Sequence, residues 1–163
     1  MARSTAELRL PTVLTEVEMR FRAGAPVRGQ MFLPDLPRTH ASQWADDLGA
    51  MLNNEPRFVP VRVDGQVQLV HKAELVMVQL SAAAAPADAQ PDEPMTLYDN
   101  MHRVMIELLG VGQVTGTVLY TSPFDRTRLI DHLNSAGRFF RLWNSESFSW
   151  LNKDHVTRVI PYE

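Results

Sequence analysis

Histidine is the side chain in this sequence best suited to metal or acid–base chemistry, and two histidines directly follow an aspartate. These pairs are Asp131–His132 and Asp154–His155. A metal site needs three or more convergent ligands, and neighbouring residues on a strand point to opposite faces. We therefore expect surface or capping roles for the histidines and no metal site. The five histidines are His40, His71, His102, His132 and His155.

The sequence contains none of the common motifs of catalysis or nucleotide binding. It has no cysteine, so cysteine nucleophiles, thiolate metal sites and disulfides are excluded. Neither GxGxxG, GxxxxGK[ST] nor GxSxG occurs. Asp46 and Asp47 stand together, and we interpret them as the solvated face of a helix. We expect a non-enzymatic protein that needs no cofactor.

Composition favours a soluble globular protein. The chain has 163 residues, 45% of them hydrophobic, and a formal net charge of −3. The charge argues against nonspecific binding to nucleic acid, which needs an excess of Lys and Arg. No apolar run approaches the ~20 residues of a membrane helix, and the N-terminus lacks a signal-peptide pattern. We expect a cytoplasmic location, to which the absence of cysteine is suited, and no membrane partner.

The phrase Leu-Asn-x-x-x-Arg-Phe occurs twice, at 52–58 and at 133–139, and it belongs to a longer internal repeat. Residues 17–29 align with 104–116, and residues 52–78 align with 133–159, without gaps. The identical positions include Gly29/Gly116, Asn53/Asn134, Arg57/Arg138, Phe58/Phe139 and Lys72/Lys153. We predict an N-terminal arm (1–14), a first repeat (15–80), an Ala/Pro-rich linker (81–95) and a second repeat (96–163).

Each repeat has the pattern β-β-α-β-β-β. Alternating apolar residues predict two opening strands joined by a glycine turn at 110–112 in the second repeat. Gly29 and Gly116 fall inside strands, where glycine indicates a sharp bend. A helix follows, which in the second repeat has a cap predicted at Ser122, Pro123 and Asp125. Asn53 and Asn134 are expected to end the helices, and Phe58 and Phe139 to begin the next strands.

The sequence resembles the Sm-like fold of the LSm and Hfq proteins. The resemblance lies in "IELLGVGQVTGTV" (106–118) and in the closing strand "LNKDHVTRVIP" (151–161), with a weaker counterpart at 70–78. It implies two tandem five-stranded barrels with inserted helices, of mainly β class, packed as a pseudo-twofold pair. It also implies RNA contact near Lys72 and Lys153. Ala73 and Asp154 stand where the Hfq branch has a histidine. The Leu-Asn-x-x-x-Arg-Phe phrase is also similar to bacterial domains of unknown function.

Arg57 and Arg138 each follow a helix-ending Asn. A guanidinium there could hold a carbonyl or carboxylate of its own chain, or grip a ligand phosphate. We favour the structural role because both copies keep the arginine.

Aromatic residues concentrate in one hairpin of the second repeat: Phe139, Phe140, Trp143, Phe148 and Trp150. Alternation makes both of its faces apolar. One face would fill its own barrel, and the other would pack on the sister repeat or form a partner surface or base-stacking platform. The candidate partner-binding residues are Arg138, Arg141, Trp143, Trp150, Lys153 and Lys72.

The expected function is that of a protein-interaction or scaffold module whose partner is a protein. The alternative is a regulatory RNA-binding protein of the Sm-like kind. Homo-oligomers could form through exposed strand edges, because an unpaired edge offers amide and carbonyl groups to another strand.

Overall fold

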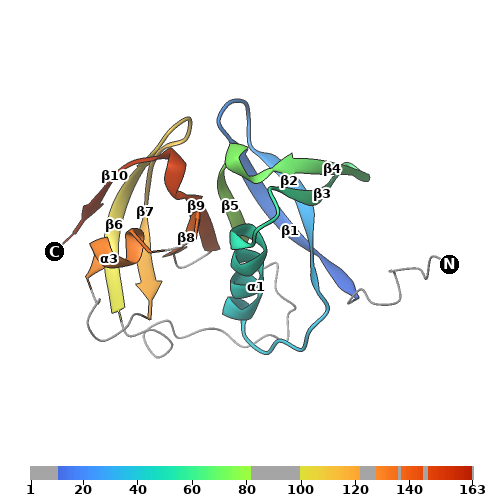
Figure 1. Ribbon diagram of the computed structural model, residues 1–163, viewed down its shortest axis with the longest axis horizontal. Coiled ribbons are helices and arrows are strands. Elements are labelled where there is room, and N and C mark those ends of the chain that lie inside the picture. The colour runs from blue at the N-terminus through green and yellow to red at the C-terminus, as the bar shows by residue number, and fades with distance from the viewer. Residues whose placement is uncertain (1–10, 82–99, 122–127, 136, 145–146, 163) are drawn as a thin grey trace.

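The structure is a computed structural model that describes residues 11–81, 100–121, 128–135, 137–144 and 147–162 (Figure 1). In the first half the elements are β1 (Thr12–Phe21), β2 (Val27–Pro34), α1 (Ala41–Asn53), β3 (Phe58–Val63), β4 (Gln66–His71), η2 (Lys72–Glu74) and β5 (Leu75–Ser81). In the second half they are β6 (Asn100–Leu108), β7 (Gly112–Tyr120), α3 (Leu129–Leu133), β8 (Phe139–Asn144), β9 (Ser147–Asn152), η4 (Lys153–His155) and β10 (Val156–Pro161). Almost all of the predicted linker, and the predicted cap at Ser122, Pro123 and Asp125, lie outside the described residues.

The strands form one open antiparallel sheet of ten strands, in the order β10-β6-β7-β8-β9-β5-β1-β2-β3-β4. The expectation of two separate five-stranded barrels is therefore wrong. The barrels do not form separately because strand β5 pairs with β1 on one side and with β9 on the other. One backbone ladder thus runs from the first half into the second.

The pseudo-twofold relation is wrong for the same reason. A twofold axis would pair a strand with its own counterpart in the other half. The observed pairing instead joins the last strand of the first half to the fourth strand of the second. The two halves are therefore joined head to tail, and Figure 1 shows β4 and β10 at opposite sides of the molecule.

The strand registers of the two halves agree position by position with the sequence alignment. Val17 faces Gly29 and Val104 faces Gly116. The same agreement holds for the pairs Met19–Val78 and Ile106–Val159, for Met31–Val61 and Val118–Leu142, and for Phe58–His71 and Phe139–Asn152.

Gly29 and Gly116 lie where two strands approach closely. A Cβ atom on Gly29 would come within 2.9 Å of the Arg62 carbonyl oxygen, and one on Gly116 within 2.8 Å of the Trp143 carbonyl oxygen. Any larger side chain would push β2 from β3, or β7 from β8. The β2–β3 and β7–β8 pairings are short: they join Gln30 to Arg62 and Met31 to Val61, and Thr117 to Trp143 and Val118 to Leu142.

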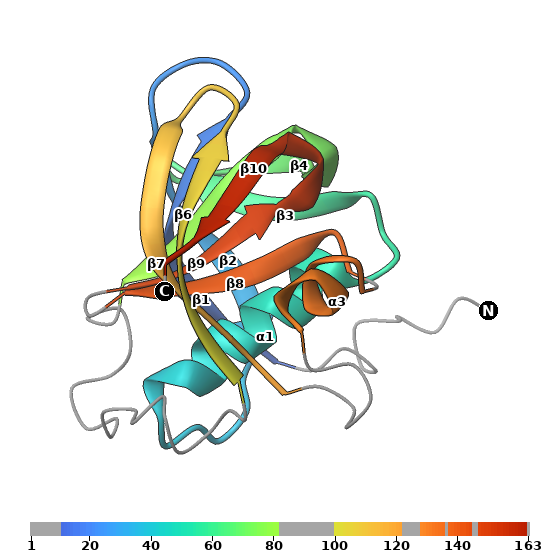
Figure 2. The same cartoon turned by 90° about the vertical axis from the view of Figure 1, so that its left-hand side faces the viewer.

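The two α-helices among the described residues differ in length. α1 has thirteen residues, and Gln43 accepts a hydrogen bond from the His40 amide at its start (2.9 Å). α3 has five described residues and ends at Asn134. Both helices lie on the lower side of the molecule as drawn in Figures 1 and 2. No helix among the described residues is long and apolar enough to cross a membrane.

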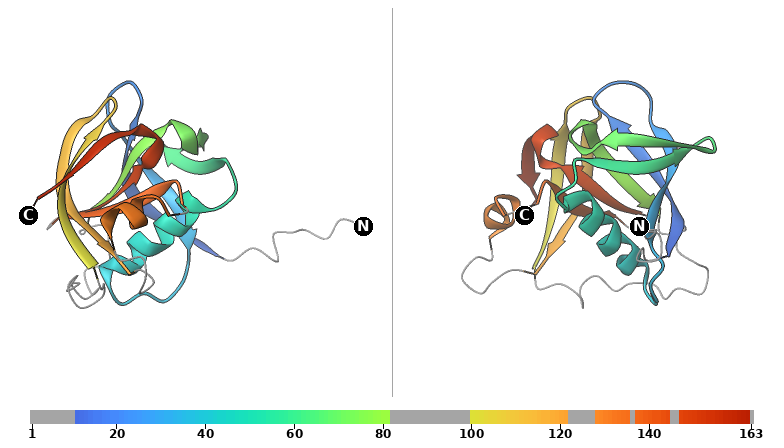
Figure 3. Two further views of the ribbon diagram at one scale, coloured as in Figure 1. Left: turned by 60° about the vertical axis from the view of Figure 1, so that its left-hand side comes forward. Right: turned by 45° about the vertical axis from the view of Figure 1, so that its right-hand side comes forward.

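Each half contributes side chains to the core of the other. Phe139 and Phe148 of the second half are buried in the cluster built around α1 and the first-half strands. Val76 and Met77 of β5 are buried in the second-half cluster. Phe140 on the opposite face of β8 fills the second half itself, so the aromatic hairpin divides its faces as alternation predicts. Figure 3 shows the halves side by side, with the β3–β4 hairpin projecting from the first.

Candidate functional site

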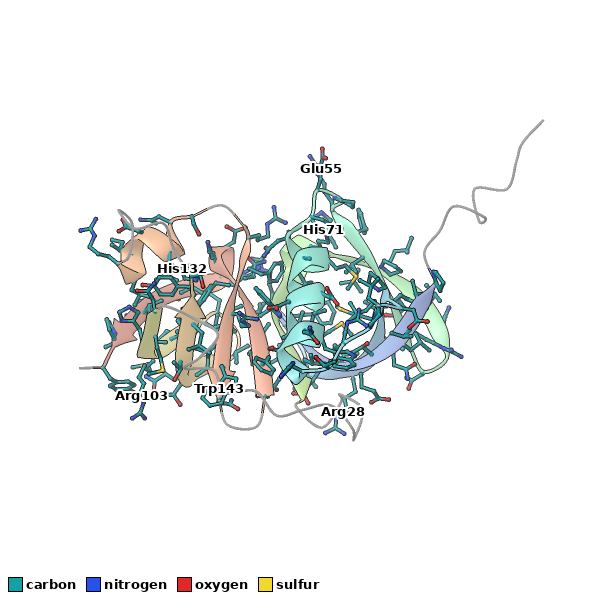
Figure 4. The ribbon with its side chains drawn as sticks, turned by 90° about the horizontal axis from the view of Figure 1, so that it is seen from below. Arg28, Glu55, His71, Arg103, His132 and Trp143 are labelled. Atoms are coloured by element: carbon teal, nitrogen blue, oxygen red, sulfur yellow. The ribbon has the colours of Figure 1, made fainter. Side chains whose placement is uncertain are left out.

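A pocket of about 300 Å³ lies where the two halves meet, between α1, α3 and strands β7 to β9. It contains three of the six predicted partner-binding residues, namely Arg141, Trp150 and Lys153. Figure 4 labels His132, another lining residue, which belongs to α3 in the second half. The lining residues are Asn53, Leu119, Tyr120, Thr121, His132, Ser135, Phe139, Phe140, Arg141, Trp150 and Lys153.

Arg141 of β8 ties the second half to α1. Its guanidinium is buried, and Nη1 donates to the carboxylate of Asp46. The guanidinium also lies 5.6 Å from the centre of the Trp150 ring. Asp46 is therefore not merely part of a solvated helix face, as the sequence suggested; likewise, Asp47 pairs with Arg38 at 2.5 Å.

Trp150 of β9 is packed into α1. Its indole Nε1 donates to the Ala45 carbonyl oxygen (2.9 Å), and its ring lies 2.1 Å from where a Cβ atom on Gly49 would stand. The ring can take this place only because residue 49 is a glycine. The contacts with the helix leave Trp150 unsuited to serve as an open base-stacking platform.

Asn53 and Phe139 join the two halves by a pair of hydrogen bonds. The Asn53 side chain donates to the Phe139 carbonyl oxygen (3.1 Å) and accepts from the Phe139 amide (2.8 Å). Asn53 ends α1 and Phe139 begins β8, as predicted. The contact between them was missed, although both residues belong to the repeated phrase. Their counterparts differ at one position only: Phe58 is exposed whereas Phe139 is buried, but Asn134 is exposed as Asn53 is.

Tyr120 is stacked between two histidines on the pocket wall. Its ring centre lies 4.2 Å from that of His132 and 5.7 Å from that of His102. The His102 Nε2 atom and the Tyr120 hydroxyl are 3.0 Å apart. Burial raises the pKa of Tyr120, and the charge of Asp131 adds to this effect. The expected surface role is thus wrong for His132, whereas His71 does cap η2 by accepting the Ala73 amide.

His132 is held neutral by its surroundings. Burial lowers its pKa to about 4, and the charges of Lys153, Arg141 and His102 act in the same direction. Its buried Nε2 atom has no hydrogen-bond partner among the described residues. Besides burial, the charges that act on His132 are those of basic side chains, whereas Asp131 acts on Tyr120 and Asp46 pairs with Arg141.

Lys72 and Lys153 hold the ends of the helical segments. Lys72 is only 3% exposed, and its ammonium group donates to the Met51 carbonyl oxygen (2.7 Å) and to Asn54. Burial lowers its pKa, as does the nearby charge of Arg138. Lys153 donates to the Ser135 carbonyl oxygen (2.9 Å), and burial lowers its pKa as well. Lys72 is too enclosed to contact RNA.

The remaining predicted residues lie outside the pocket. Arg138 forms an ion pair with Asp154 (3.5 Å), and Trp143 packs on the edge of the first core. The side chain of Arg57 is exposed. The carbonyl oxygen of Arg57 accepts a hydrogen bond from the Lys72 amide, and that of Arg138 accepts one from the Lys153 amide (2.8 Å each).

No three His, Asp or Glu side chains gather as metal ligands would within the part of the chain that the structure describes. Comparisons with known protein families, with curated proteins and with solved structures found no match to this chain.

Proposed function

We propose that this protein is a non-enzymatic interaction or scaffold module that binds a protein partner through the exposed edge of strand β4. The observation that carries this proposal is the apolar surface of the β3–β4 hairpin. Phe58, Val67 and Leu69 are 54%, 55% and 72% exposed. Within the described residues β4 pairs only with β3, so its outer backbone groups are available to another strand.

The basic and aromatic candidate residues support the same proposal, because they already bond other parts of the chain. Arg141 and Trp150 are committed to α1, and Lys72 is committed to the end of that helix. These side chains stabilise the junction between the halves. The surface that remains for a partner is therefore apolar at the β4 edge.

The test is capture of partners from native lysate, with and without nuclease, by the full chain and by edge variants. We expect a discrete protein that resists nuclease and is lost when Val67→Glu and Leu69→Glu are combined. Leu109→Glu is the matched control, because Leu109 is 56% exposed but lies at the β6–β7 turn. Equal capture by the edge variant and the control would overturn the proposal.

RNA binding is the second candidate, and the basic side chains that line the pocket, Arg141 and Lys153, favour it. Burial is the main reason that His132 is neutral, and the charges of Lys153 and Arg141 act in the same direction. Basic side chains of this kind attract phosphate. The resemblance to Sm-like proteins implies the same kind of partner. Recovery of discrete RNAs that disappear with Lys153→Ala would support this candidate over the protein partner.

A further inference from the structure

We infer that the partner of the β4 edge is a second copy of this chain, which binds head to tail through strand β10. This inference rests on the proposed function, because it names the strand that occupies the β4 edge. It starts from the junction inside the molecule, where β5 pairs with β9.

The internal junction is a template for an intermolecular one. Because residues 52–78 align with residues 133–159, β9 corresponds to β4 and β5 corresponds to β10. The junction therefore uses one β4-type edge and one β5-type edge. The other edge of each type, β4 itself and β10, stands at an end of the ten-stranded sheet. Figure 1 shows these ends on opposite sides of the molecule, where they cannot pair with each other.

The alignment also predicts the register of the new pair. Val78 faces Trp150 at the internal junction, and the aligned residues are Val159 and Leu69. Arg158 would face Val70, and Ile160 would face Gln68, so no like charges meet. Pro161 has no amide hydrogen, and we expect the ladder to end there.

Side chains at the two ends repeat the contacts of the junction. Asn53 bonds the backbone of Phe139 internally, and the aligned pair is Asn134 and Phe58. Phe139 is 3% exposed, whereas Phe58 is 54% exposed. Asn134 at the β10 end thus corresponds to the asparagine of the internal contact. Phe58 at the β4 end corresponds to the phenylalanine whose backbone that asparagine bonds.

The packing of strand against helix is repeated with a compensating change of volume. Inside the molecule Trp150 lies on Gly49 of α1. Continued three residues further back without a gap, the alignment pairs Gly49 with Ile130 of α3, and it pairs Trp150 with Leu69. Ile130 is 57% exposed and Leu69 is 72% exposed. The large Trp150 ring on Gly49 thus corresponds to Leu69 on Ile130, and these two side chains together have a similar volume. Burial of both would stabilise the contact by the transfer of their apolar surface from water.

Association of unlike ends is heterologous, so each added molecule leaves one β4 end and one β10 end available. Such contacts produce closed rings when the rotation between molecules allows closure, and filaments when it does not. The inference predicts assemblies of more than two chains.

The decisive experiment blocks one end at a time and then mixes the blocked chains. Leu69→Glu blocks association through the β4 end and Ile130→Glu blocks association through the β10 end, and both positions are exposed.

Sedimentation velocity of the full chain should show concentration-dependent assembly, whereas each variant alone should sediment at the monomer mass of 18.4 kDa. An equimolar mixture should form a heterodimer, because the Ile130→Glu chain keeps a β4 end and the Leu69→Glu chain keeps a β10 end. Leu109→Glu should assemble like the unmodified chain.

Crosslinking tests the register independently, because the chain contains no cysteine. Oxidation of a mixture of Leu69→Cys and Val159→Cys chains should give a disulfide-linked dimer at least tenfold faster than a mixture of Leu69→Cys and Leu109→Cys.

Two results would overturn the inference: an unmodified chain that stays monomeric at every concentration, or an Ile130→Glu chain that still dimerises alone. A monomeric chain that still captures another protein through Leu69 would leave the proposed function standing and remove only the second copy as its partner.

Discussion

Lys72 and Lys153 occupy aligned positions, yet their surroundings differ. Lys72 is almost wholly buried and bonds the last carbonyl groups of α1, whereas Lys153 is partly exposed and makes one bond to Ser135. Removal of a buried donor leaves carbonyl groups unsatisfied and opens a cavity. We therefore expect Lys72→Ala to lower the free energy of unfolding by about 2–4 kcal/mol, and Lys153→Ala by less than about 1 kcal/mol.

Urea titration of both variants measures this difference. Lys72→Met is the control, because it keeps most of the side-chain volume and removes only the charge and its hydrogen bonds. Equal losses for the two alanine variants would show that Lys72 is not part of the interior.

The burial of His132 makes stability depend on pH. The folded pKa of His132 is about 4, below the ordinary value of 6.5, so the unfolded chain binds the proton more tightly. Stability must therefore fall as pH drops below the unfolded pKa, and the loss continues until the folded pKa is reached. Between about pH 7 and pH 5 this histidine would cost up to about 2 kcal/mol.

His132→Phe isolates the effect, because it keeps a ring on Tyr120 and removes the titrating group. We expect the unmodified chain to lose more stability than the variant over this interval, measured by denaturation at each pH. Parallel pH profiles for the two proteins would exclude the assigned role of His132.

At the scale of elements, the contact between α1 and β9 opposes helix propensity. Alanine is favoured over glycine in a helix interior by about 1 kcal/mol, so Gly49→Ala would stabilise an isolated α1. In the folded chain the added methyl group would collide with the Trp150 ring. Overpacking of this kind costs about 1–3 kcal/mol, and we expect net destabilisation.

Thermal denaturation of Gly49→Ala tests this expectation. A second variant, Gly49→Ala with Trp150→Leu, should lose less than the sum of the two single changes, because the smaller side chain makes room for the methyl group. A variant more stable than the unmodified chain would mean that Trp150 does not lie on α1.

Alternation and the repeated phrase predict most individual elements. Asn53 and Phe139 end and begin the elements predicted for them, and the two apolar faces of β8 divide between two cores. The pairing of β5 with β9 could not be predicted in the same way, because a backbone ladder forms through amide and carbonyl groups that every residue carries. The second apolar face of β8 and β9 indicates that another part of the chain buries it. A closed barrel packed on the sister repeat and a longer shared sheet would both bury that face.

The pocket was harder to predict than the sheet. Arg141, Trp150 and Lys153 were expected at one surface from their closeness in sequence. Their partners Asp46 and Gly49 come from a helix about a hundred residues away. No local pattern connects those residues with β8 and β9, and only the head-to-tail junction brings them together.

At the scale of the whole molecule, the two halves cannot be separate folding units. Phe139 belongs to the second half but is buried in the core of the first, and the β5–β9 ladder crosses between them. Loss of either half would expose apolar surface of the other. The halves should therefore unfold together.

Phe139→Ala tests this interdependence, with Phe58→Ala as its control at the aligned position. Phe139 is buried at the junction, so its truncation should cost about 3–5 kcal/mol. Phe58 is 54% exposed, and its ring centre lies 4.8 Å from that of His71. Differential scanning calorimetry, at concentrations low enough to keep the chain monomeric, should show one transition for each protein. The whole transition should move to lower temperature in Phe139→Ala and stay nearly unchanged in Phe58→Ala. Two resolved transitions, of which only one responds to Phe139→Ala, would mean that the halves fold independently and that the shared sheet does not couple them.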